Sequence, residues 1–111
     1  MTTIKASKML INEPPLTVSP SLATLIGLNE AIALQQLHYW LQNPKAGIMK
    51  DGHKWIFNTM GEWQDGNFPF WSTKTISRTW SSLASWGLVI VKQFDQRDRN
   101  MRNYYRIDYE A

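Results

Sequence analysis

The chain has 111 residues, a formal net charge of +3 and a hydrophobic content of 43%. This length and composition predict one globular domain that builds its own core. The sequence contains no cysteine, which excludes disulfides and thiolate chemistry. It also has no apolar run suited to a signal peptide or a membrane span, so we expect a soluble, cytoplasmic protein with no membrane partner.

Residues 1–18 are predicted to form an extended N-terminal arm, and residues 19–111 are predicted to form the folded domain. The adjacent Pro14 and Pro15 exclude a helix in the arm. The arm also carries an apolar patch that begins at Met9. It is expected either to pack against its own chain or to cross to a second copy in a homo-oligomer.

Two helices are predicted next. Ser19-Pro20 combines an N-cap residue with a proline at the first helical position, and Gly27 is a typical stop. Asn29 is predicted to cap a second helix that ends at about Leu41. The domain therefore begins with a helical pair.

The segment from Lys45 to Gly52 is predicted to be a loop, because it contains two glycines. Lys54–Asn58 is rich in aromatic and β-branched residues, which favours a short strand. Thr59 and Glu62 have the spacing of a capping box, in which each side chain bonds to the backbone of the other residue. A short helix is expected to follow.

The strongest helix signal covers residues 72–86, where Ser72 is a predicted N-cap and Gly87 a predicted stop. Apolar residues at helical spacing are expected to face the core. These are Ile76, Trp80 and Leu83. The opposite face is polar, and residues 72–86 contain no acid.

Two strands are predicted after this helix, at 88–94 and 101–109, separated by the polar turn 95–100. The segment 54–58 is expected to pair with this hairpin. The predicted fold class is therefore α+β: a winged helix-turn-helix in which a helical bundle packs on a small three-stranded antiparallel sheet.

Basic residues are concentrated in the predicted helix and hairpin. Residues 66–106 contain seven bases and two acids, whereas the rest of the chain contains five bases and seven acids. Such a distribution is typical of a surface that binds phosphates. The predicted contacts to double-stranded DNA are Ser72, Thr73, Lys74, Ser77, Arg78 and Ser81 in the helix, and Arg97, Arg99 and Arg102 in the hairpin.

The residues for a catalytic or metal site are sparse. His38 and His53 are far apart in sequence, and no cysteine is available to complete a metal site. Glu62 and Asp65 lie one helical turn apart, but Glu62 already has a predicted capping role. The glycines form neither a P-loop nor a dinucleotide-binding motif. We therefore expect no metal, no cofactor and no enzymatic activity.

Six segments resemble one known family. They are Leu10-Ile-Asn-Glu-Pro-Pro-Leu, Ile26-Gly-Leu-Asn-Glu-Ala-Ile, Leu34-Gln-Gln-Leu-His-Tyr-Trp-Leu, Asp51-Gly-His-Lys-Trp-Ile-Phe-Asn-Thr, Phe68-Pro-Phe-Trp-Ser and Tyr105-Arg-Ile-Asp-Tyr. Together they resemble the N-terminal winged-helix domain of replication initiator, or replisome-organiser, proteins from phages and mobile elements of Gram-positive bacteria. The helix here differs from the family pattern, because serine, threonine and Trp80 stand where members often have several basic residues.

The resemblance implies binding of origin DNA at replication initiation, with residues 72–86 as the reading helix and 94–101 as the wing. It also implies self-association, and recruitment of replication proteins through a DnaD-like region that lies further on in many members. Two alternatives stay open from the sequence. One is a transcriptional regulator of winged-helix type, and the other is a protein-interaction or dimerisation module.

Overall fold

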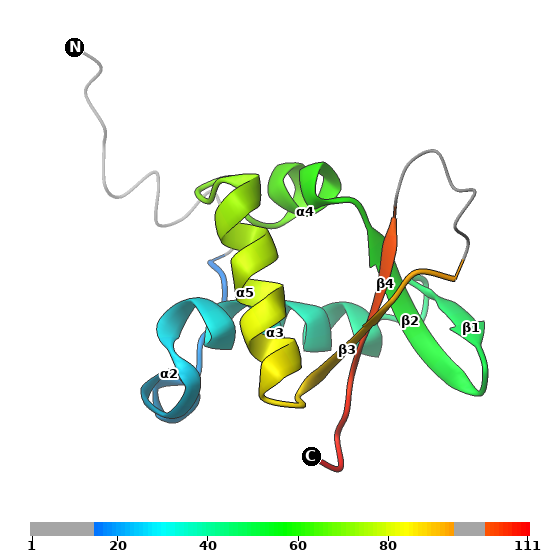
Figure 1. Cartoon of the computed structure of the whole chain (residues 1–111), viewed down its shortest axis with the longest axis horizontal. Coiled ribbons are helices and arrows are strands. Elements are labelled where there is room, and N and C mark those ends of the chain that lie inside the picture. Colours follow the sequence, from blue (N-terminus) through cyan, green and yellow to red (C-terminus); the bar gives the residue numbers. More distant parts are fainter. Residues whose placement is uncertain (1–14, 95–101) are drawn as a thin grey trace.

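The computed structural model describes residues 15–94 and 102–111 (Figure 1). The described residues form an α+β structure, as predicted. Its helices are α2 (Pro20–Ile26), α3 (Leu28–Gln42), α4 (Met60–Gly66) and α5 (Thr73–Ser85). Its strands are β1 (Ile48–Lys50), β2 (His53–Asn58), β3 (Val89–Lys92) and β4 (Asn103–Ile107). Of the predicted arm, only residues 15–18 are described, and they are irregular and exposed.

The sheet has four antiparallel strands in the order β1-β2-β4-β3. The prediction of three strands was wrong, because the presumed loop 45–52 contains β1. Asp51 and Gly52 both have positive φ, of 53° and 77°. Two such residues between paired strands form a tight hairpin whose twist matches that of the sheet. Ile48 then lies opposite Trp55, and β1 extends the sheet by one strand.

The start of the second helix also differs from the prediction. The carbonyl oxygen of Gly27 accepts a hydrogen bond from the backbone N–H of Ala31, so α3 begins at Leu28. Asn29 therefore lies inside the first turn and is not the cap. The N-cap residue is Gly27, which has no side chain, so no side-chain hydrogen bond caps the start of α3.

The two strands of the predicted hairpin are shorter than expected. β3 ends at Lys92 and β4 runs from Asn103 to Ile107, whereas the sequence pattern extended them to residues 94 and 109. The described residue Phe94 is in a bend rather than in the ladder. The predicted turn at 95–100 lies outside the described residues.

Helices α3, α4 and α5 cover one face of the sheet and enclose an aromatic core (Figure 1). Trp63 lies at its centre and is fully buried. Its ring centroid is 5.0 Å from that of Trp80, 5.4 Å from that of Tyr105 and 5.8 Å from that of Phe68. Ile76, Trp80 and Leu83 are buried as predicted, so α5 is attached to the core along its inner face.

The end of α5 is fixed by a pair of backbone hydrogen bonds. The N–H of Leu88 donates to the carbonyl of Leu83, and the N–H of Gly87 donates to that of Ala84. This is a Schellman motif, in which the C′ residue adopts the left-handed conformation that glycine favours. Gly87 has a φ of 76°. The chain turns at Gly87, the helix stop that the sequence predicted, and enters β3 at Val89, one residue later than expected.

Candidate nucleic-acid interface

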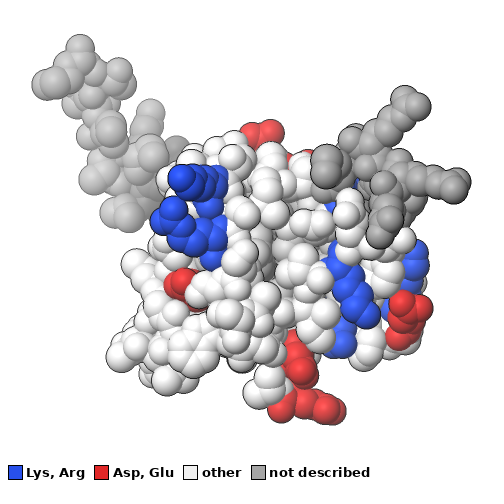
Figure 2. Space-filling model, viewed as in Figure 1, with Lys and Arg blue, Asp and Glu red and all other residues white. Residues whose placement is uncertain are grey.

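The outer face of α5 is a polar and basic surface. Five of the exposed polar side chains of α5 recur at the three- and four-residue spacing of one helix face. They are Lys74, Ser77, Arg78, Ser81 and Ser85. None of the 13 residues of α5 is acidic. Figure 2 shows a group of basic side chains over this part of the molecule.

The N-terminal end of α5 is capped as predicted. The Ser72 hydroxyl oxygen accepts a hydrogen bond from the backbone N–H of Thr75, at 3.1 Å. The next residue, Thr73, is exposed, and Lys74 adds a positive charge within the first turn. The positive end of the helix dipole and this lysine therefore favour an anion at the same place.

Hydrogen bonds to Asn67 hold the connection between α4 and α5 in place. The Asn67 side-chain oxygen accepts hydrogen bonds from Gln36 Nε2 and from Trp40 Nε1, both at 2.7 Å. Gln64 Nε2 donates to the carbonyl of Trp71 at 2.9 Å, just before the start of α5. Residues of α3 and α4 thus position the first turn of α5, which carries Lys74.

The structure brings six of the nine predicted contact residues together on α5 and its cap. These are Ser72, Thr73, Lys74, Ser77, Arg78 and Ser81, all of which are exposed. Among the described residues, Lys74 and Arg78 have no acidic partner. Arg97 and Arg99 lie outside the described residues.

The ninth residue, Arg102, is engaged with Glu62. Arg102 Nε donates to one carboxylate oxygen of Glu62 at 3.0 Å, and its Nη2 donates to the other at 3.2 Å. Glu62 also accepts a hydrogen bond from the backbone N–H of Thr59, in the capping box that the sequence predicted. The Arg102 hydrogen bonds, followed by that of Thr59, lower the pKa of the Glu62 carboxyl. Arg102 therefore links the start of β4 to α4.

Glu62→Gln is expected to change how stability depends on pH. Because the folded-state pKa of Glu62 lies below its unfolded-state value, the pair stabilises the fold above about pH 4.5. This contribution is lost as the pH falls through the lowered pKa. Glutamine can still accept from Thr59, but it has no charge to lose. Urea denaturation should show the wild type to be the more stable at pH 7, and the difference should shrink by pH 3. A difference that is the same at both pH values would contradict this role.

A second group of cations lies on the sheet, and the sequence analysis did not include it in the site. Lys50, Lys92 and Arg106 come from β1, β3 and β4. Figure 2 shows basic side chains over this part of the molecule, apart from those on α5. The signal that could have found this group is Asp51-Gly52, which is a typical hairpin turn and would have put Lys50 in a strand.

The described residues offer no metal site, because no group of three His, Cys, Asp or Glu side chains comes together in them. His38 instead lies 2.8 Å from the Tyr109 hydroxyl, measured from its Nδ1 atom. Within the same part of the chain, no helix has the length and apolar character that crossing a membrane requires.

Comparisons of the chain with protein-family models, with curated proteins and with solved structures find no match.

Proposed function

We propose that this chain is a winged helix-turn-helix domain that binds double-stranded DNA and catalyses no reaction. The order of its elements supports this proposal. Helix α3 is followed by the strands β1 and β2, then by α4 and α5, and then by the hairpin strands β3 and β4. β4 lies between β2 and β3 in the sheet. In a winged helix this order leaves the helix before the hairpin free to enter a DNA groove.

The acid-free outer face of α5 is the observation that carries the proposal. The inner face is buried in the core, so the outer face is available along the whole helix. Arg78 can donate two hydrogen bonds to guanine O6 and N7, and the serine hydroxyls can donate or accept at base edges or phosphates. Lys74 lies at the N-terminal end, where such helices usually meet the bases.

Origin DNA at replication initiation is the proposed natural target. The support for this choice is the resemblance of the six sequence segments to replication initiators, since a fold of this kind serves replication and transcription alike. The target would then occur in the replicon that encodes the chain.

Selection from a random duplex library, followed by binding measurements on the enriched sequence, tests the proposal. Arg78→Ala is expected to weaken binding to that sequence by about 1–3 kcal/mol and to relax discrimination at one base position. The selected sequence should also occur in the encoding replicon's own origin.

Lys45→Ala is the matched control, because it also removes one exposed positive charge but lies between α3 and β1. This variant should bind the enriched sequence more tightly than other duplexes by the same factor as the wild type does. If Arg78→Ala keeps full discrimination, α5 is not the reading helix. If the library yields no enriched sequence and no binding, the DNA-binding proposal fails.

A further inference from the structure

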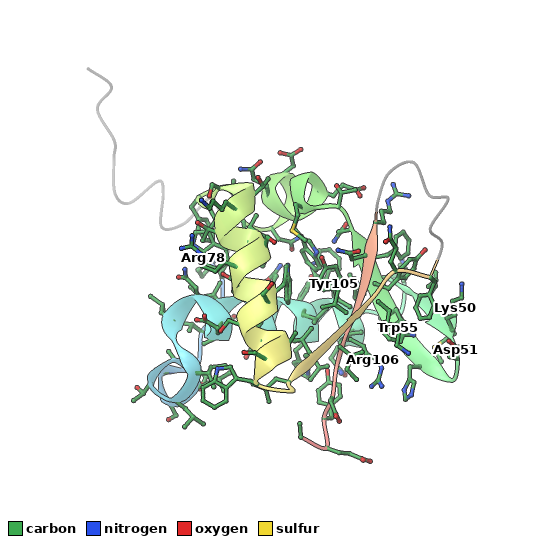
Figure 3. All side chains as sticks on the ribbon, in the orientation of Figure 1. Lys50, Asp51, Trp55, Arg78, Tyr105 and Arg106 are labelled. Atoms are coloured by element: carbon green, nitrogen blue, oxygen red, sulfur yellow. The ribbon has the colours of Figure 1, made fainter. Side chains whose placement is uncertain are left out.

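The sheet carries a second cluster of aromatic rings on the face turned away from the helices. Ile56 and Tyr105 point to the core, so their strand neighbours must point to the other side. These neighbours include Trp55, Phe57 and Tyr104. Figure 3 shows Tyr105 on the helix side of the sheet, with Trp55 and Arg106 on the far side. We call this the outer sheet face.

The aromatic rings of the outer sheet face form a continuous strip. The ring centroids of Trp55 and Phe94 are 4.9 Å apart, those of Phe94 and Tyr104 are 5.1 Å apart, and those of Tyr104 and Phe57 are 5.5 Å apart. Trp55 is only 1% exposed, and its Nε1 donates to the carbonyl of Lys50 at 2.9 Å. The other three rings are half-buried and keep part of their surface open. The buried Trp55 therefore anchors the strip to the sheet, and the solvent-accessible ring surface belongs to Phe57, Phe94 and Tyr104.

Cations surround the strip at short range. Lys50 Nζ lies 4.7 Å from the Phe94 ring centroid, whereas Arg106 Cζ and Lys92 Nζ lie 5.3 and 6.0 Å from that of Trp55. The Nε–H of Arg106 is buried and has no acceptor within the described part of the chain. None of the four strands contains an acidic residue. The strands themselves therefore supply no negative charge to these cations, and the acids next to them in the sequence are Asp51, in the turn after β1, and Asp108, directly after β4.

Rings and cations on one face match a particular ligand. Single-stranded nucleic acid offers unpaired bases that stack on aromatic side chains, and phosphates that pair with Lys and Arg. Duplex DNA hides the faces of its bases in its own stack, so it would use only the cations. A sheet face that carries both features is complementary to a single strand.

We propose that the outer sheet face binds single-stranded DNA. Unpaired bases stack on Phe57, Phe94 and Tyr104, and the phosphates contact Lys50, Lys92 and Arg106. The site uses strands, whereas the proposed duplex site uses α5. Each of the two proposals can therefore be contradicted without affecting the other.

Fluorescence anisotropy of a labelled 15-nucleotide oligo(dT), with the full chain, tests this site. Tyr104→Leu keeps an apolar side chain in the sheet but removes the ring, and it is expected to weaken oligo(dT) binding roughly 5- to 150-fold, the effect of one lost base stack. The double variant Lys50→Gln with Lys92→Gln changes two exposed side chains, so its folding should be unchanged. It is expected to weaken binding and to reduce its dependence on salt.

Arg78→Ala is the control, because it should weaken duplex binding and leave oligo(dT) binding unchanged. Three results would overturn the site: no binding of oligo(dT) by the wild type, full binding by the Lys50 and Lys92 double variant, or an equal loss of both ligands in Arg78→Ala. Oligo(dT) binding without any duplex binding would support the single-strand site on the sheet and contradict the proposal that α5 binds duplex DNA.

Discussion

Replacing Trp63 with alanine is expected to lower the free energy of unfolding by about 3–5 kcal/mol. Trp63 is fully buried and contacts Phe68, Trp80 and Tyr105. Its removal leaves a cavity at the point where α4, α5 and β4 meet, and rings packed on three sides cannot collapse into it. Domains of this size have a total free energy of unfolding of about 5–15 kcal/mol, so the variant should be only marginally stable. Urea denaturation followed by circular dichroism measures the loss.

Trp86→Ala is the matched control, because it removes the same side chain from a position that is 55% exposed. Its effect should stay within about 0.5 kcal/mol. If both variants unfold at the same urea concentration, Trp63 is not the centre of the core. Trp63→Phe should recover part of the loss, since it restores an aromatic ring to the site.

Duplex DNA binding is expected to weaken steeply with salt. Each phosphate contact made by Lys or Arg contributes about −0.9 to the slope of log K against log salt. Arg102 is paired with Glu62 and is not counted, so the charged contacts are Lys74, Arg78, Arg97 and Arg99. Four contacts give a slope of about −3.6. Raising the salt from 50 to 200 mM should then lower the affinity roughly 150-fold. Anisotropy titrations of a random duplex at several salt concentrations measure this slope.

The double variant Lys74→Gln with Arg78→Gln should reduce the slope by about 1.8, because two contacts are lost. Ser77→Ala with Ser85→Ala changes the same helix face without changing its charge, and it should keep the wild-type slope. A wild-type slope near zero would show that α5 does not contact phosphates. An unchanged slope in the charge variant would place the contacts elsewhere.

The elements that the sequence predicted well are those whose ends are set by local chemistry. Ser72 and Gly87 enclose α5, and Thr59 with Glu62 starts α4. In each case the cap is made by residues within one helical turn. Local sequence patterns are therefore sufficient to place these helices, and with them the exposed face of α5 that holds most of the predicted contact residues.

The features that the sequence analysis did not predict depend on how neighbouring strands pair and on which backbone hydrogen bond begins a helix. β1 has only three residues, and its pairing with β2 makes it a strand. Asn29 has the right chemistry for a cap, but the backbone of Gly27 starts the helix two residues earlier. Trp55 is buried, yet it lies on the other side of the sheet from Trp63. Which side of the sheet a ring occupies follows from strand register, which composition does not give.

The short connection between α5 and β3 has a consequence for the shape of the DNA. The Schellman hydrogen bonds at Gly87 join the end of α5 directly to the start of β3. The direction of α5 relative to β3 is therefore fixed before any ligand binds. For a protein that binds duplex DNA as proposed, the duplex rather than the protein must then adjust its groove width and curvature. The cost of that deformation depends on base sequence. Flexible pyrimidine–purine steps beside the reading helix would thus be favoured at positions that no side chain touches.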